Sequence, residues 1–280
     1  MASAEADSAA SPRSGRAASR RRAKLIGVYG GTFNPIHVGH LRAAEEVAEA
    51  LALARVIFVP SATPPHKTND REDAIAPAAD RLAWVRLAIA GNPRFEVSAI
   101  EVERGGASYL VDTLRELRAR IAPDEAVFLV GSDAFAEMGA WRAPAELFTL
   151  AHYAVMVRPP LRTGSLATWL PEVVRDDVEI SADQRSARHR RAGTWLRLVE
   201  IAGFDVSASE VRQRLREGRS VRYLLPESVR EAVLASGAFA CAGHVVEDPC
   251  DFGAREIGVH DQAGPGRDVR FMAFGRQPRT

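Results

Sequence analysis

The chain carries the segment Gly30-Gly31-Thr32-Phe33-Asn34-Pro35-Ile36-His37-Val38-Gly39-His40 between two regular patterns. Before it, residues 25–29 are apolar and include β-branched and aromatic side chains, which is typical of a buried strand. After it, apolar residues recur at steps of three or four, which predicts a helix over about residues 37–52. A strand, a glycine turn and a helix in this order are typical of an open α/β sheet, whose ligands bind at the carboxyl ends of the strands.

The residue types of this segment suit a phosphate group. Gly30 and Gly31 lack a Cβ, so a ligand and the backbone can approach closely. Asn34 and Pro35 favour the start of a helix, and a helix N-terminus attracts anions. His37 and His40 are three positions apart and share one helix face. Two imidazoles beside such a turn can stabilise negative charge on a phosphoryl centre.

Other interpretations of the two histidines explain fewer features of this segment. A capped surface helix would explain the spacing but not the preceding glycines and proline. Half of a zinc site would need further ligands, and no Cys or His lies nearby in the sequence. The segment is not a P-loop, because no Gly-Lys-Ser/Thr follows, and it lacks the dinucleotide pattern GxGxxG.

A second segment, Val206-Ser207-Ala208-Ser209-Glu210-Val211-Arg212, also opens a helical pattern. Ser207 and Glu210 form a capping box, which is a structural signature. Ser209 and Arg212 lie on the same early face of that helix, where a hydroxyl, a guanidinium and the helix N-terminus can clamp a polyphosphate.

The two segments together resemble the signatures of nucleotidylyltransferases with an HxGH motif. In that family the first motif usually reads Gly-Gly-Thr-Phe-Asp-Pro-Ile-His-x-Gly-His, and Asn34 stands where Asp is usual. The second motif is usually Ile-Ser-x-Ser/Thr-x-x-Arg, with Val206 here in place of Ile. Both motifs occur in the expected order, separated by the length of an α/β domain.

Further residues resemble the bacterial nicotinate-nucleotide adenylyltransferases within that superfamily. They are Pro64-Pro65-His66-Lys67 after a strand at 55–60, Ser108-Tyr109 with Thr113-Leu114, and Gly131-Ser132-Asp133 followed by Trp141. Members often carry Thr after the Tyr and Tyr after the Trp, where this chain has Leu110 and Arg142.

Each of these residues also has a structural interpretation. His66 and Lys67 could form a solvated loop tip. Asp133, which could accept from a ribose hydroxyl, could equally be a helix N-cap. Trp141 could pack in the interior rather than stack on a pyridine ring.

Composition and charge limit the remaining possibilities. The 280 residues include 37 basic and 36 acidic residues, so bulk charge favours neither nucleic-acid nor membrane binding. Cys241 and Cys250 form no disulfide framework, which favours a reducing cytoplasm. No apolar run reaches the roughly 18 residues of a transmembrane helix. Residues 1–23 read as a disordered basic extension rather than a transit peptide, and 240–280 as a disordered or loosely attached tail.

The domain is therefore expected at 24–239, as a doubly wound, mostly parallel α/β sheet with a small helical C-terminal part. The expected strands are 25–29, 55–60, 95–100, 126–130, 152–159 and 195–201. The later helices are expected at 80–90 with Asp80 as its cap, at 108–121, from Ser207 and from Pro226. Residues 160–194 read as an insertion or long connection, with a helix around 166–175.

The resemblance implies adenylyl transfer from ATP to nicotinate mononucleotide in NAD biosynthesis. It assigns His37, His40 and Arg212 to catalysis, and His66, Lys67, Tyr109 and Trp141 to the mononucleotide. The residues that it assigns to nucleotide binding are Gly30, Gly31, Thr32, Gly131, Asp133, Ser207, Ser209 and Arg212. Mg²⁺ would bind through the ATP phosphates without a protein metal site.

Alternatives remain open at this stage. A sibling adenylyltransferase could act on nicotinamide mononucleotide or phosphopantetheine, and a non-catalytic nucleotide-binding protein could share the fold. The sequence does not separate nicotinate from nicotinamide, and it leaves homo-oligomerisation and the effect of Asn34 undecided.

Overall fold

The computed structural model describes residues 23–64, 75–158 and 165–239. In these residues the strands form one sheet in the order β3-β2-β1-β4-β5-β8-β7-β6. The strands are β1 Leu25–Gly31, β2 Arg55–Pro60, β3 Phe95–Val97, β4 Glu125–Gly131, β5 His152–Val157, β6 Val178–Ile180, β7 Ser186–His189 and β8 Trp195–Glu200. The pairs from β3 to β8 are parallel, whereas β7 and β6 are antiparallel additions.

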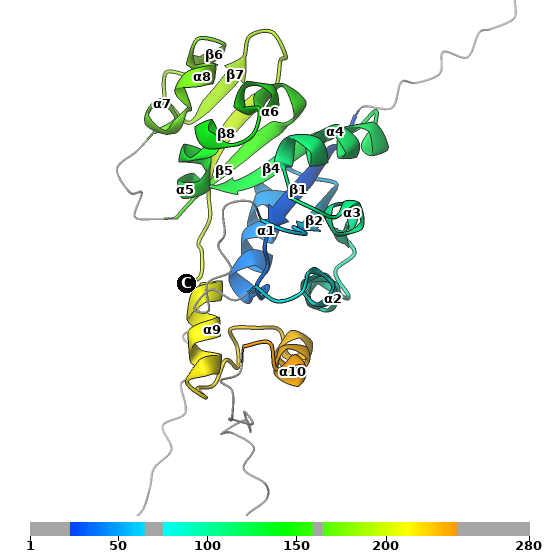
Figure 1. Cartoon of the computed structure of the whole chain (residues 1–280). Helices are drawn as coiled ribbons and strands as arrows, with labels where there is room; N and C mark the ends of the chain where they lie inside the picture. Colours follow the sequence, from blue (N-terminus) through cyan, green and yellow to red (C-terminus); the bar gives the residue numbers. More distant parts are fainter. Residues whose placement is uncertain (1–22, 65–74, 159–164, 240–280) are drawn as a thin grey trace, which may run out of the picture.

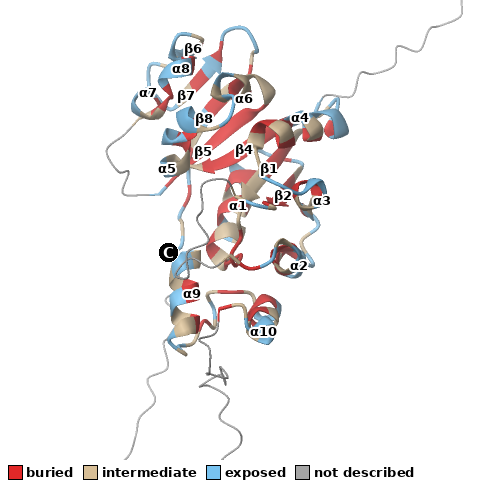
Figure 2. Cartoon of the chain, in the orientation of Figure 1, coloured by how far each residue is buried: buried red, intermediate tan, exposed pale blue. Residues whose placement is uncertain are grey.

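Helices cover both faces of the sheet (Figure 1). They are α1 Val38–Ala50, α2 Ala78–Ile89, α3 Ile100–Arg104, α4 Leu110–Ile121, α5 Ser132–Ala136, η2 Met138–Ala140, α6 Pro144–Leu150, α7 Leu166–Trp169, α8 Glu172–Arg175, α9 Ala208–Arg216 and α10 Glu227–Ser236. One core packs α1, α2, α9 and α10 on one face, and a second core packs α4, α6, α7 and α8 on the other. Figure 2 shows the buried residues concentrated on the strands between these layers. The predicted doubly wound sheet with a helical C-terminal part is confirmed.

The strand order reverses at β1. The chain runs outward from β1 through β2 to β3, and then returns to β4 on the other side of β1. In open α/β sheets ligands bind outside the carboxyl ends of the strands at such a switch point. Gly30 and Gly31 end β1, two residues beyond the predicted strand, and Gly131 ends β4 before Ser132 and Asp133 open α5, so both predicted nucleotide segments lie at this point.

Several predicted element boundaries were wrong. The first helix begins at Val38 with His37 as N-cap, whereas Asn34 and Pro35 form a turn before it. Asn34 is not a cap because its side chain and carbonyl bind other segments, as described below. The N-cap of α2 is Pro77, and Asp80 lies within the first turn.

Two predicted stretches were also assigned the wrong length or type. The strand at 95–100 ends at Val97, because the chain turns into α3 from Ile100. The described part of 160–194 contains β6 and β7 as well as α7 and α8. These strands are three and four residues long, too short to show an alternating pattern.

The predicted domain at 24–239 contains every described element. The predictions of a disordered extension and a disordered or loosely attached tail fall on 1–22 and 240–280, outside the described residues. Within the described ranges, no helix combines the length and apolar character that crossing a bilayer requires.

Candidate active site at the switch point

The two histidines of the first motif lie against each other at the start of α1. Their ring centroids are 3.7 Å apart, with the planes 33° from parallel. The backbone N–H of His37 donates to Nδ1 of His40 at 3.2 Å. An accepting ring nitrogen carries no proton, so this contact places the His40 proton on Nε2.

Burial sets the protonation of the first histidine. His37 is 5% exposed, and its burial, with the nearby Arg158 guanidinium as a second cause, lowers its pKa from 6.5 to about 4. The imidazole is therefore neutral at pH 7. The pair can offer hydrogen-bond donors to an anion, but His37 does not act as a fixed cation.

Gly39 lets the two motifs meet. A Cβ on this residue would lie 2.9 Å from Cγ1 of Val206 and 3.1 Å from Nδ1 of His37. Val206 directly precedes Ser207, the N-cap of α9, whose side chain accepts from the Glu210 N–H at 3.1 Å. The N-termini of α1 and α9 thus pack closely only because residue 39 has no side chain.

Arg212 makes the second link between the motifs. Its side chain is 4% exposed. Nη1 donates to the carbonyl oxygen of Asn34 at 3.1 Å, and Nη2 donates to Oγ of Ser209 at 3.2 Å. The structure therefore brings together the histidine turn and the serine-arginine turn, which are more than 160 residues apart in the sequence.

The glycines of the first motif also have a packing role within the fold. A Cβ on Gly31 would lie 3.1 Å from the ring of Phe33, and a Cβ on Gly30 would lie 3.3 Å from Phe128. Phe33 adopts a left-handed backbone with φ of 50° and is buried. Here the missing side chains make room for the protein's own aromatic rings, and Thr32 continues the turn between Gly31 and Phe33.

A second group of predicted residues gathers beside this turn. Ser108 joins the loop after β2, because its N–H donates to the Thr63 carbonyl at 2.9 Å and its Oγ accepts from the Ala62 N–H at 2.8 Å. The next residue, Tyr109, carries the Arg142 guanidinium over its ring at 4.6 Å. Trp141 is half-buried and packs against the second core. His66 and Lys67 lie outside the described residues.

The residues after β4 have the predicted placement. Gly131 ends β4 and is the N-cap of α5, so the alternative of an N-cap role for Asp133 is wrong. Asp133 lies exposed in the first turn of α5 at the carboxyl edge of the sheet. Its carboxylate is thus placed where a hydroxyl-bearing ligand could reach it.

Sequence reasoning missed two arginines of this region. Arg158 follows β5 directly, and its stem packs against Gly203. The sequence signal that could have identified Arg158 is its position as a basic residue directly after a buried parallel strand. Arg81 lies fully buried in α2, and no sequence signal distinguished it from the solvent-facing arginines of an amphipathic helix.

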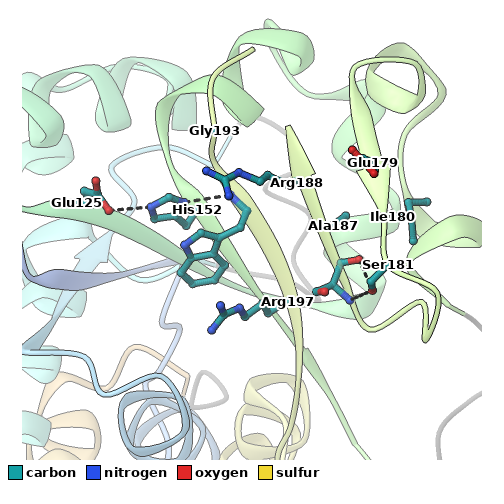
Figure 3. Close-up of a pocket in the computed structure, with 11 residues that line it drawn as sticks. Glu125, His152, Glu179, Ile180, Ser181, Ala187, Arg188, Gly193 and Arg197 are labelled. Carbon is teal, nitrogen blue, oxygen red and sulfur yellow. Dashed lines mark hydrogen bonds and ion pairs between the residues drawn. The ribbon is translucent and has the colours of Figure 1, made fainter. Parts of the chain in front are cut away.

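A cavity of about 640 Å³ lies elsewhere and contains none of the predicted site residues (Figure 3). Its lining includes Glu125, His152 and Trp195, the first residues of β4, β5 and β8, so it opens at the amino ends of the parallel strands. His152 binds Glu125 at 3.1 Å and stacks on Trp195 at 4.5 Å. The motif residues lie at the opposite edge of the sheet, at the carboxyl ends of the parallel strands.

The donor set offers little to a resident metal ion. Among the described residues, no group of three or more His, Cys, Asp or Glu side chains could hold one.

A doubly wound sheet with these two turns at its switch point is the architecture of a nucleotidyltransferase, and the family model described as cytidylyltransferase-like matches residues 28–214. A protein of Geotalea daltonii named probable nicotinate-nucleotide adenylyltransferase is 43% identical over 210 residues, which cover 74% of this chain and 94% of that protein. A protein of the same name from Trichlorobacter lovleyi is 42% identical, with 76% and 98% covered. The chain belongs to the nicotinate-nucleotide adenylyltransferase family.

A solved structure supports the fold. The Plasmodium falciparum nicotinic acid mononucleotide adenylyltransferase complexed with NaAD superposes with a TM-score of 0.56 at 14% identity. The match covers 77% of this chain and 97% of that one.

Proposed function

We propose that this protein transfers the adenylyl group of ATP to nicotinate mononucleotide. A 5′-phosphate oxygen of the mononucleotide attacks the α-phosphorus, the bond from that phosphorus to the bridging oxygen breaks, and pyrophosphate leaves. The product is nicotinic acid adenine dinucleotide. The observation that carries the proposal is the contact between the histidine turn and the Arg212 turn.

The reaction needs no nucleophile from the protein, so positioning and charge stabilisation must supply the rate. In the proposed complex, Nε2–H of His40 donates to the α-phosphate and His37 lies beside it. The neutral imidazole of His37 and the Nε2–H of His40 can both donate to an already anionic group. Ser207, Ser209 and Arg212 receive the β- and γ-phosphates at the N-terminus of α9, where the helix dipole favours the charge of the leaving pyrophosphate.

The acceptor is proposed to lie on the Tyr109 side of the turn. Asp133 accepts from a ribose hydroxyl, and Trp141 stacks on the pyridine ring. Arg142 is exposed and held over Tyr109. A guanidinium at this position favours a carboxylate over a neutral carboxamide, and it is the residue to which we attribute a preference for nicotinate. His66 and Lys67 are assigned to the phosphate of the mononucleotide on the sequence resemblance alone.

Mg²⁺ is proposed to enter as part of the Mg–ATP substrate, bound through the phosphates. The described residues that face the site offer hydroxyls, imidazoles and a guanidinium rather than a carboxylate cluster. The balanced net charge and the family's soluble substrates support a cytoplasmic setting without a nucleic-acid partner.

Pyrophosphate release from purified protein tests the proposal. The assay contains Mg–ATP with nicotinate mononucleotide, nicotinamide mononucleotide or phosphopantetheine, and a fourth reaction without an acceptor. We expect release only with an acceptor, and the highest kcat/KM with nicotinate mononucleotide. Equal or faster turnover of phosphopantetheine would assign a sibling activity, and ATP binding without release with any acceptor would leave a nucleotide-binding protein.

A further inference from the structure

One arginine of α2 joins three separate backbone segments around the proposed site. Arg81 is 1% exposed. Its Nη1 donates to the Thr32 carbonyl at 2.7 Å, its Nη2 to the Ala62 carbonyl at 2.8 Å, and its Nε to the Ala76 carbonyl at 2.9 Å. A guanidinium has five N–H groups in a rigid plane, so it can hold three acceptors in fixed directions.

Two of the three carbonyls belong to the two sides of the proposed reaction. Thr32 lies in the turn that leads to the histidines. Ala62 lies in the loop after β2, and its N–H donates to Ser108 Oγ, next to Tyr109. Arg81 therefore fixes the distance between the turn assigned to ATP and the loop that binds Ser108, on the Tyr109 side assigned to the mononucleotide.

Asn34 extends these contacts to α9. Its Oδ1 accepts from the Ala76 N–H at 3.0 Å, and its carbonyl accepts from Arg212 at 3.1 Å. Asn34 is 3% exposed. The hydrogen bonds thus run without a break from Arg212 through Asn34 and Ala76 to Arg81, and from there to both loops.

Arg81 keeps its charge in this setting. Burial lowers its pKa from 12.5 to about 10, and the nearby Glu101 carboxylate works in the opposite direction. The side chain is protonated at pH 7, so its three contacts are charge-assisted and stronger than neutral hydrogen bonds.

We infer that Arg81 is a positioning residue of the adenylyl transfer. It holds the loop at residues 61–64, on the mononucleotide side, at a fixed position relative to the phosphate turn. This inference rests on the proposed function. A displacement of about 1 Å between reacting groups can lower a rate by about 10²-fold. Arg81 therefore controls turnover without contacting either substrate.

Arg81→Lys is the informative variant, because it keeps the positive charge but its single, slightly shorter ammonium cannot satisfy three carbonyls in one plane. Arg230→Lys is the matched control. Arg230 is also a buried arginine, 8% exposed, but it binds Glu227 within its own helix α10. Ser108→Ala loosens the same loop from its other side by removing the acceptor of the Ala62 N–H.

Initial rates of pyrophosphate release, with each substrate varied in turn, give kcat and both KM values, and thermal melts give the folded fraction. For Arg81→Lys we expect a fall in kcat of about 10–100-fold, a raised KM for the mononucleotide and a KM for ATP close to wild type. Ser108→Ala should show the same rise in the mononucleotide KM, and it decides the question if Arg81→Lys does not fold. Arg230→Lys should match the wild type.

A merely structural Arg81 would give a different result. Its loss would lower kcat only in proportion to the folded fraction and leave both KM values unchanged, and that result overturns the inference. Wild-type rates in folded Arg81→Lys overturn it as well. If the wild-type protein itself releases no pyrophosphate, the proposed function has failed, which the control reactions reveal before any variant is compared.

Discussion

His37 and His40 have similar chemistry but are held by different means. His37 is fixed by burial, which keeps it neutral, whereas His40 is fixed by accepting the His37 N–H at Nδ1. Sequence spacing predicted that the two rings share one face. It did not predict that His37 is neutral, because the pKa of His37 depends on burial by segments distant in the chain and on Arg158.

The His40 side chain should contribute through Nε2. We expect His40→Ala to lower kcat by on the order of 10²–10³, the usual effect of losing one donor to a developing charge. His40→Asn is the control, because an amide oxygen can still accept the His37 N–H while no donor reaches the Nε2 position. Steady-state kinetics should show both variants equally slow; recovery in the Asn variant would mean that His40 acts only by capping the turn.

Acid should destabilise the protein through His37. Its pKa is lowered from 6.5 to about 4 on folding, so between these values the unfolded chain binds the proton more readily. The stabilisation is complete above pH 6.5 and is lost as the pH falls toward 4. The change is about 1.4 kcal/mol per pH unit, or about 3 kcal/mol in all.

Urea unfolding of the wild type and of His37→Asn at pH 7 and pH 4.5 measures how much His37 contributes to the loss of stability in acid. Because Asn does not titrate, the wild type should lose about 2–3 kcal/mol more than the variant between the two pH values. Other titrating groups cancel in the comparison. Parallel losses in the two proteins would show that His37 takes up its proton in the folded state as easily as in the unfolded state.

Arg142 should decide between the two mononucleotides. We expect Arg142→Gln to lower kcat/KM for nicotinate mononucleotide by about tenfold or more, since a charge-assisted hydrogen bond is worth about 1.5–3 kcal/mol. Turnover of nicotinamide mononucleotide should change little, because its carboxamide carries no charge. A variant that loses both activities to the same extent would place Arg142 outside the recognition of the pyridine substituent.

At the scale of elements, prediction succeeded where a local pattern and its tertiary role coincide. Buried strands such as β2 and β4 show continuous apolar runs, and Ser207 caps α9 as its position indicated. Prediction failed for residues whose hydrogen bonds or burial come from segments that are distant in the sequence. Asn34 looked like a helix cap but binds Ala76 and Arg212, and Arg81 is buried by loops that no local pattern reveals.

The junction of α1 and α9 depends on Gly39. Replacing a helical Gly by Ala usually stabilises a helix by roughly 0.5–1 kcal/mol. Here the new Cβ would lie 2.9 Å from buried Val206 and 3.1 Å from His37. We therefore expect Gly39→Ala to destabilise the protein by about 1–3 kcal/mol and to lower turnover.

A double-mutant cycle with Val206→Ala isolates this contact. Removing the Val206 methyl groups makes room for the new Cβ, so the double variant should be more stable than the sum of the single effects predicts. Urea unfolding gives the coupling energy. Strict additivity would mean that the two helix N-termini are not in contact through these residues.

At the scale of the whole molecule, Phe239, the last residue that the structure describes, belongs to the first core. The sheet and both cores are formed by described residues of 23–239, and Phe239 is buried against Trp84 of α2, with ring centroids 5.9 Å apart. Sequence patterns predicted a domain over 24–239, and this boundary stays a prediction. They gave no indication that Phe239 belongs to the core, because it follows the C-cap of α10 and has no periodic neighbours.

Shortening the chain at two points tests this boundary. A protein that ends after Phe239 should keep the turnover and melting temperature of the full chain, since it retains every described element. A protein that ends after Gly237 loses a buried Phe side chain and should be less stable by about 2 kcal/mol. Phe239→Ala in the full-length protein should reproduce this loss, which separates the ring from the length of the chain. If turnover already falls in the protein that ends after Phe239, residues 240–280 contribute to the reaction and the domain extends beyond the predicted boundary.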